Sequence, residues 1–247
     1  MILINVSNIS KTYHTPTKEV IALDDLNFTI NEGEILGIVG TSGCGKSTLL
    51  NILTNLEKSD RGSITSSKSI VIGYMMQNDA LLPWLNVYDN AILGLKLKKI
   101  TTKDNLAYVD NLLKKYGLYE FKNEYPNSLS GGMRQRVALI RTLAIRPNIL
   151  LLDEPFSKLD IDSRITISDD VYKIIKELGI TTVLISHDIA ESISLSDRII
   201  VLTKRPGKIK NIYEVNINEE TIPSKRRNSE YFLELYQTIW GDIDHVS

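Results

Sequence analysis

A glycine-rich segment between residues 40 and 48 is the feature that most constrains the fold of this chain. It reads GTSGCGKST and matches the pattern G-x-x-x-x-G-K-[ST]. An apolar run at residues 34–39 precedes it, and apolar residues with helical spacing follow it at residues 46–55. This order predicts a phosphate-binding loop that joins a buried strand to a helix.

The residue types of this segment suit the binding of phosphate. Glycines allow the backbone to pass close to phosphate oxygens, and the following helix adds the positive end of its dipole. We expect Lys46 to bind the β- and γ-phosphates and the Ser47 hydroxyl to bind Mg²⁺. The predicted phosphate-binding residues are Gly40, Thr41, Ser42, Gly43, Cys44, Gly45, Lys46, Ser47 and Thr48. A chance glycine-rich turn is the alternative, and the strand and helix on either side argue against it.

Two acids end another apolar run, where residues 149–152 lead directly into Asp153 and Glu154. A parallel strand delivers its last residues to the carboxyl edge of the sheet, where α/β proteins bind ligands. We expect Asp153 to hold Mg²⁺, directly or through water, and Glu154 to polarise the attacking water as general base. The structural alternative is a polar strand end before Pro155, which the upstream phosphate loop makes the weaker interpretation.

Strand and helix patterns alternate along the rest of the chain. Residues 1–10 and 20–30 alternate apolar and polar side chains, as half-buried antiparallel strands do. Short apolar runs predict strands at 34–39, 69–76, 148–152, 181–185 and 198–203, and helical spacing predicts helices at 46–55, 168–178 and 230–240. Because helical patterns fill residues 78–146, we expect a parallel-sheet core with an inserted helical subdomain.

Composition excludes several other classes of protein. The formal net charge of −1 argues against a nucleic-acid binder, which would carry a clear basic excess. The single cysteine, Cys44, excludes an internal disulfide, and its place in the loop favours a small residue in a tight turn over a redox group. No run of about 18 apolar residues occurs, so we expect no segment to span a bilayer.

The segment LSGGMRQR at residues 129–136 points to a known family. Ser130 is a favourable N-cap, and the first turn of the helix that follows offers free N–H groups to a second phosphate site. The segment resembles the LSGGQ signature of ABC ATPases, with Met133 where glutamine is commonest. The resemblance implies an α/β fold, namely a RecA-like P-loop NTPase core with an N-terminal antiparallel β subdomain and an inserted α-helical subdomain.

In that family two chains sandwich two ATP molecules head to tail. The resemblance therefore implies that Ser130, Gly131 and Gly132 reach the γ-phosphate bound by a second copy of the chain. It also implies one nucleotide-binding domain over residues 1–247, with the helical subdomain at about 78–146 and a short C-terminal extension at about 210–247.

Other positions match the family in order. Tyr13 resembles the aromatic residue that stacks on adenine, and Gln77 resembles the glutamine that senses Mg²⁺ and the transport partner. Asp160 ends a segment, SKLD, that resembles the dimer-contact loop, although Lys158 replaces the usual alanine. His187 matches the switch histidine. The resemblance thus implies hydrolysis of ATP to ADP and phosphate, with catalytic residues Glu154, His187, Gln77 and Lys46 and with Mg²⁺ ligands Ser47, Gln77 and Asp153.

Two longer segments narrow the resemblance. QNDALLPWLNV at residues 77–87, and SHDIAES at 186–192 followed by KRPGKI at 204–209, are similar to segments of the nitrate, sulfonate and taurine importer ATPases. Within the first, residues 81–84 are expected either to receive a helix of the membrane subunit or to be buried core. These two alternatives are equally favoured by the sequence.

This resemblance implies an ATPase subunit at the cytoplasmic face of the membrane, held there by transmembrane permease subunits and acting indirectly with a solute-binding protein. An aliphatic sulfonate is the first expected solute, followed by nitrate and taurine, and related importers carry thiamine-precursor pyrimidines. A soluble ABC ATPase outside transport is the alternative class, which usually has two fused cassettes or a long coiled-coil insertion. A P-loop kinase or GTPase does not explain LSGGMRQR.

Overall fold

The computed structural model describes residues 1–217 and 222–244 of the chain. The chain divides into two compact units: a phosphate-loop unit of residues 1–70 and 168–247, and a helical unit of residues 71–167. Residues 218–221 and 245–247 of the predicted C-terminal extension lie outside the described residues. The subdomain limits at 78–146 and 210–247 stay predictions.

The phosphate-loop unit contains a three-stranded antiparallel sheet in the order β2-β1-β4. The strands are β1 (Ile2–His14), β2 (Glu19–Asn31) and β4 (Arg61–Ser66). The predicted alternation in the first two is confirmed, because Ile4 and Val6 of β1 and Phe28 and Ile30 of β2 are buried. The sequence does not predict β4, since nearly all of its side chains are exposed and leave no apolar alternation.

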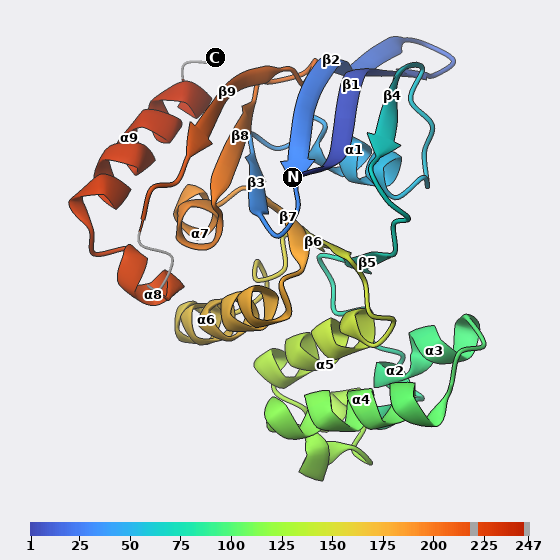
Figure 1. Cartoon of the computed structure of the whole chain (residues 1–247). Helices are drawn as coiled ribbons and strands as arrows, with labels where there is room; N and C mark the ends of the chain where they lie inside the picture. The colour runs from blue at the N-terminus through green and yellow to red at the C-terminus, as the bar shows by residue number, and fades with distance from the viewer. Residues whose placement is uncertain (218–221, 245–247) are drawn as a thin grey trace. The chain divides into compact units, whose positions relative to one another are not determined.

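Parallel strands form the centre of the same unit (Figure 1). β3 (Ile35–Val39) lies between β7 (Thr181–Ser186) and β8 (Arg198–Leu202), and all side chains of β3 and β7 are buried. Strands covered on both faces read as continuous apolar runs, as predicted. β9 (Ile209–Glu214) pairs antiparallel with β8. The sequence does not predict it, because none of its side chains is fully buried and its apolar residues do not alternate.

Helices α1 (Lys46–Leu53), α7 (Ile189–Leu195), α8 (Pro223–Arg226) and α9 (Glu230–Asp244) complete the described part of this unit. The helix predicted at 230–240 is confirmed in α9, whose Phe232, Leu235 and Ile239 pack in one buried cluster with Ile199 and Val201 of β8. This packing explains the amphipathic pattern at the C-terminal end. The short helix α7 is absent from the sequence predictions.

The helical unit combines a parallel strand pair with a group of helices (Figure 1). β5 (Ile72–Met75) pairs with β6 (Ile149–Asp153). Its helices are α2 (Val87–Ala91), α3 (Leu93–Leu97), α4 (Lys103–Lys115), η1 (Tyr119–Phe121), η2 (Pro126–Ser128) and α5 (Gly131–Leu143). In α4 the apolar residues Val109, Leu112 and Leu113 are buried, which confirms the predicted amphipathic helix.

Helix α6 (Ile161–Leu178) begins in the range of the helical unit and continues in the phosphate-loop unit. The predicted start at residue 168 is wrong. The Asp160 carboxylate accepts a hydrogen bond from the Ser163 N–H at 2.9 Å, and this cap begins the helix at Ile161. The first turns escape prediction because they are mostly polar or exposed.

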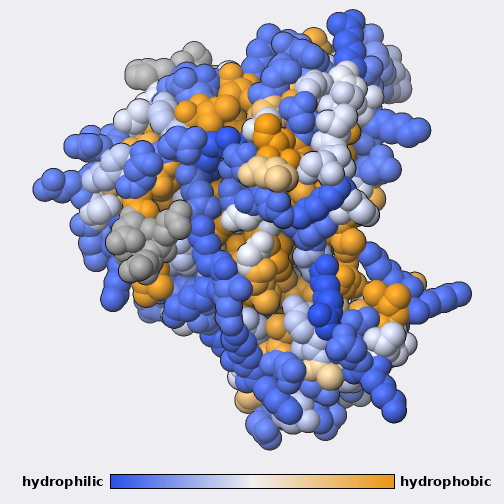
Figure 2. All heavy atoms as spheres, in the orientation of Figure 1, coloured by the Kyte–Doolittle hydropathy of each residue, from blue (hydrophilic) through white to orange (hydrophobic). Residues whose placement is uncertain are grey.

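The surface is mixed in polarity. Figure 2 shows one face, on which hydrophilic side chains predominate and hydrophobic ones form smaller patches. Among the exposed large apolar residues of the helical unit are Met76, Trp84, Leu97, Phe121 and Tyr125. None of the helices within residues 1–217 and 222–244 combines the length and the apolar character that crossing a bilayer requires.

Candidate nucleotide-binding site

The glycine-rich segment forms a tight loop between β3 and α1. Gly43 and Gly45 have φ angles of +78° and +110°, a backbone region in which side chains cause strain. A Cβ on Gly45 would lie 2.5 Å from Leu23 Cδ2 and 2.8 Å from the Ala22 carbonyl oxygen, both on β2. Position 45 therefore requires glycine for two reasons: its positive φ angle and its close approach to β2. The motif also predicts glycine at this position.

Lys46 is directed back over the loop. Its ammonium donates hydrogen bonds to the carbonyl oxygens of Gly40 at 2.7 Å and Thr41 at 3.0 Å, and the residue is only 7% exposed. Cys44 is buried, and its Sγ lies 3.8 Å from Lys46 Nζ. The position of Cys44 agrees with a small residue that fills a tight turn. A buried lysine within the loop places its charge where phosphate is predicted to bind.

Tyr13 and His187, predicted to contact the nucleotide, also belong to the phosphate-loop unit. Tyr13 lies near the end of β1 opposite Val20 and is partly buried, with the Lys11 ammonium 5.5 Å from its ring centroid. His187 directly follows β7 and is exposed, and Asp188 caps α7 by accepting a hydrogen bond from the Glu191 N–H. Their roles toward a nucleotide stay predictions.

The predicted acid pair stands at the end of β6 in the helical unit. Asp153 Oδ2 accepts a hydrogen bond from the Tyr74 hydroxyl at 3.1 Å. Burial, together with the nearby Asp153 charge, raises the pKa of Tyr74 to about 12, so the phenol stays protonated as a donor. This partner of Asp153 was not predicted, because the two residues are far apart in the sequence.

Glu154 has a φ angle of +46°, which is unfavourable for a residue with a side chain. Backbone strain of this kind is concentrated at functional sites. Glu154 Oε2 accepts a hydrogen bond from Gln77 Nε2 at 2.9 Å. The structure thus brings together the predicted general base and the predicted sensing glutamine, a pairing that the sequence does not reveal.

The predicted metal ligands carry oxygen donors, which Mg²⁺ prefers. Ser47 offers an exposed hydroxyl, Asp153 a half-buried carboxylate and Gln77 an amide oxygen. Within residues 1–217 and 222–244, no three His, Cys, Asp or Glu side chains gather into a metal-binding cluster. Mg²⁺ commonly takes one or two protein oxygens and completes its shell with water and substrate phosphate, so each of these oxygen donors is of a kind that suits it.

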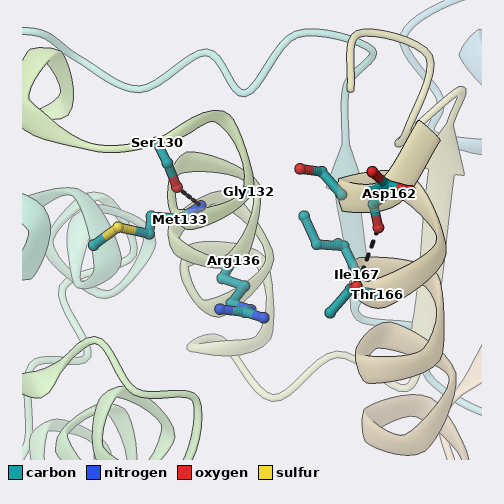
Figure 3. A pocket seen from close by; sticks show the side chains of 8 residues that line it. Ser130, Gly132, Met133, Arg136, Asp162, Thr166 and Ile167 are labelled. Atoms are coloured by element: carbon teal, nitrogen blue, oxygen red, sulfur yellow. Dashed lines mark hydrogen bonds between the residues drawn. The ribbon is translucent and has the colours of Figure 1, made fainter. Parts of the chain in front are cut away.

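The signature segment forms the N-terminal end of α5. The Ser130 hydroxyl accepts a hydrogen bond from the Met133 N–H at 3.3 Å, which confirms the predicted N-cap. A cavity of about 300 Å³ lies beside this tip in the helical unit. Figure 3 shows its lining, which comprises Ser130, Gly132, Met133, Arg136, Asp162, Ser163, Thr166 and Ile167.

Gly132 at this tip lies close to the side chain of Ile167, so a larger residue would require that flexible side chain to shift. A Cβ on Gly132 would lie 2.7 Å from Ile167 Cδ1 on α6. The residues contributed by α6 were not predicted as part of the site. Arg136 could have been found because it lies inside the signature segment. For Asp162 and Thr166 the sequence offered only the polar character of the start of α6 as a sign that they belong to the site.

Side chains of α5 hold the segment that follows Gln77. Arg134 Nε forms an ion pair with Asp79 Oδ2 at 3.1 Å. The Arg141 guanidinium donates to the carbonyl oxygens of Asp79 at 2.6 Å and Ala80 at 2.7 Å. Lys158 also donates to the Asn78 side chain. The signature helix and the segment after the sensing glutamine are therefore joined directly.

Asp160, predicted to contact nucleotide across a dimer, is engaged locally. Hydrogen bonding from the Ser163 backbone lowers the pKa of its carboxyl, and this bond caps α6. The structure thus gives Asp160 a role in shaping the loop before α6. Its predicted contact with nucleotide stays a prediction.

Several known proteins are similar to this chain in sequence or in fold. The sequence model described as ABC transporter matches residues 23–157. The chain is 38% identical over 253 aligned residues to YtlC of Bacillus subtilis (strain 168), an uncharacterised ABC transporter ATP-binding protein, with 100% of this chain and 97% of that protein covered. It is 35% identical over 248 residues to an aliphatic sulfonates import ATP-binding protein, SsuB of Bacillus cereus, with 98% and 96% covered.

Among solved structures, a dimeric post-hydrolysis state of the ATP-binding cassette MJ0796, bound to ADP and Pi, is similar in fold. Its TM-score is 0.74 and its sequence identity 31%, covering 87% of this chain and 99% of that chain. The predicted fold class is confirmed by this likeness together with the family match.

Proposed function

This chain belongs to the ABC transporter family and is an ATPase of that family, and we propose that it powers a bacterial importer by ATP-driven closure of a dimer. An aliphatic sulfonate is the first expected solute, because SsuB carries that name and is similar over nearly the whole chain. The chain would act at the cytoplasmic face of the membrane, bound to transmembrane permease subunits that receive solute from a binding protein.

The observation that supports this proposal most is that one chain carries two different elements of a kind suited to binding phosphate. The phosphate-loop unit offers the glycine turn with buried Lys46. The helical unit offers the capped tip of α5 with Ser130 beside a cavity. Two copies arranged head to tail would bring the tip of each to the triphosphate held by the other, as in a sandwich of two ATP molecules.

Each predicted residue then has a task in hydrolysis. Lys46 and the loop amides hold the phosphates, Tyr13 stacks on adenine, and Ser130, Gly131 and Gly132 of the second copy donate to the γ-phosphate. Glu154 accepts a proton from the attacking water, and its hydrogen bond with Gln77 keeps its carboxylate oriented. His187 stabilises the γ-phosphate, and Asp160 contacts the second copy.

Mg²⁺ is the proposed metal, and Ser47, Asp153 and Gln77 are the residues that would hold it. When bound, it neutralises charge on the phosphate oxygens. The Tyr74 hydroxyl fixes one oxygen of Asp153 and so orients the carboxylate.

Docking to the permease is proposed for the exposed part of residues 81–84. Trp84 is 69% exposed, whereas Leu81 is 9% exposed. Part of the segment therefore lies at the surface, where a partner could bind, and part of it is buried in the core. We expect Trp84→Ala to retain ATP binding and lose permease-stimulated hydrolysis. Leu81→Ala, as a core control, should lower thermal stability instead. Full permease stimulation in Trp84→Ala would exclude this docking surface.

A complementation experiment tests the head-to-tail dimer. Lys46→Ala removes the loop charge, and Ser130→Glu adds a negative charge at the tip, so each variant alone should be nearly inactive. In a mixed dimer, the Ser130→Glu copy keeps its loop and the Lys46→Ala copy keeps its tip. One composite site is therefore intact, and ATPase activity should return on mixing.

The controls are each variant alone at the same total concentration, and a mixture of two Lys46→Ala preparations. Absence of any recovery in verified mixed dimers would contradict a composite site. Full wild-type turnover by a strictly monomeric chain would contradict the proposed dimer mechanism as a whole.

A further inference from the structure

The segment KRPGKI at residues 204–209 has no role in the mechanism above, although it lies against the phosphate loop. It follows β8 and leads into β9. Arg205 Nε donates a hydrogen bond to the Gly43 carbonyl oxygen at 3.1 Å. Residues separated by most of the chain are thus joined at the predicted phosphate site.

Gly207 brings this segment close to the loop. A Cβ on Gly207 would lie 2.1 Å from the Cys44 carbonyl oxygen, so any other residue would displace the backbone. The Gly207 N–H donates to the Ala22 carbonyl and the Gly207 carbonyl accepts from the Asp24 N–H, each at 3.0 Å. The segment is therefore fixed to β2 on one side and packed on the phosphate loop on the other.

Thr203 stiffens the same turn from within. Its hydroxyl donates to the Pro206 carbonyl at 2.8 Å and accepts from the Lys208 N–H at 2.9 Å. The backbone that carries Lys204 and Arg205 is consequently held at both ends. Because the backbone of the turn is already fixed, these two cations can bind an anion without the entropy cost of ordering the turn.

A cavity of about 520 Å³ opens where this turn meets the phosphate loop, lined by Thr41, Ser42, Gly43, Lys204 and Arg205. The lining contains two cations and no acid. In the described part of the chain neither Lys204 nor Arg205 forms an ion pair, whereas neighbouring Lys208 pairs with Asp24 at 2.7 Å. Both charges therefore stay available at the mouth of the loop.

We propose that Lys204 and Arg205 form a cationic wall of the nucleotide site that increases affinity for the polyphosphate chain, with Arg205 positioning the loop through Gly43. This inference rests on the nucleotide binding proposed above. Arg205 acts on the peptide between Gly43 and Cys44. Its carbonyl accepts from Arg205, and its N–H donates to the Thr41 carbonyl at 3.3 Å. Holding both ends of this peptide fixes the curvature of the loop.

Binding measurements on the full chain test the wall. Titration calorimetry with ATP and with inorganic tripolyphosphate should show Arg205→Ala binding about fivefold more weakly, and Lys204→Ala/Arg205→Ala about tenfold more weakly. The loss should be similar for both ligands, because tripolyphosphate lacks the nucleoside. Arg205→Lys should recover part of the affinity by keeping the charge. The differences should shrink as salt is raised.

Lys208→Ala is the matched control, since it removes a cation from the same turn outside the cavity and should bind within about twofold of wild type. Thermal midpoints without ligand should agree among the variants, which separates positioning from loss of folding. Lys46→Ala provides the reference for a lost phosphate site.

Failure of wild type to bind ATP would overturn the proposed function and this inference together. Wild-type affinity in Arg205→Ala, alongside clear loss in Lys46→Ala, would overturn the cationic wall alone. An equal loss in Lys208→Ala, or a loss confined to ATP and absent for tripolyphosphate, would also overturn it.

Discussion

In the proposed dimer, the phosphate loop of one copy and the tip of α5 of the other bind the same triphosphate, yet the two elements are built differently. The loop is made of main chain: glycines at φ +78° and +110° define its path, and Lys46 is held by two carbonyl oxygens. The tip of α5 depends on side chains: the Ser130 hydroxyl caps the helix, and Arg134 in its first turn pairs with Asp79. Backbone geometry gives tight binding, whereas adjustable side-chain pairs suit a step that must be switched.

This difference predicts different consequences of mutation. Changes in the loop should weaken nucleotide binding. Changes at the tip of α5, at Glu154 or at the pair of Arg134 and Asp79 should leave binding by a single chain nearly intact and alter turnover or coupling.

Glu154→Gln should slow ATP hydrolysis by about 100-fold or more, because the amide no longer accepts the proton of the attacking water. ATP affinity should be close to wild type, and an ATP-bound dimer should accumulate, measurable by size-exclusion chromatography with light scattering. Glu120→Gln, at an exposed acid of the same unit, is the control. Wild-type turnover in Glu154→Gln would rule out the base assignment.

Lys46→Ala should weaken ATP affinity about 30-fold, since it removes charge-assisted hydrogen bonds to phosphate. Calorimetry gives the affinity, and a thermal scan checks the fold. Lys68→Ala removes a cation that pairs with Glu32 at the surface and should change neither. If Lys46→Ala bound ATP as wild type does, the contrast between a binding loop and a switching tip would fail.

Ser130→Ala should destabilise the start of α5 by about 1 kcal/mol and lower turnover, while ATP binding by the single chain is retained. Thr102→Ala removes the corresponding cap of α4, where the Thr102 hydroxyl accepts from the Asn105 N–H. Chemical denaturation should show similar losses in both variants. An equal loss of turnover in Thr102→Ala would show that Ser130 acts through stability alone.

The pair of Arg134 and Asp79 is partly exposed, with side chains 37% and 30% accessible, so its direct coupling should be about 0.5 kcal/mol. A double-mutant cycle with Arg134→Ala and Asp79→Ala, followed by denaturation, measures it. Both single variants should keep ATP affinity and reduce permease-stimulated hydrolysis. Additive stability effects, with stimulation unchanged, would remove this pair from the coupling step.

Much of the fold follows from local patterns. The buried runs of β3 and β7, the alternation of β1 and β2, and the spacing in α4 each report the burial of one element. Three elements were not predicted: the strands β4 and β9 and the first turns of α6. Few or none of their side chains are fully buried. An element that buries little leaves little trace in the hydrophobic pattern.

By itself the sequence determined the glycine turn of the phosphate loop, the buried strand that ends at Asp153 and the Ser130 cap, because each depends on the residue types of one short segment. Only the tertiary structure decided that Gln77 contacts Glu154, that Arg134 contacts Asp79 and that Arg205 reaches Gly43. Such contacts join residues distant in the chain, and their geometry exists only after the strands and helices have packed. The side-chain partners of a site, unlike its loop motifs, are therefore products of the fold.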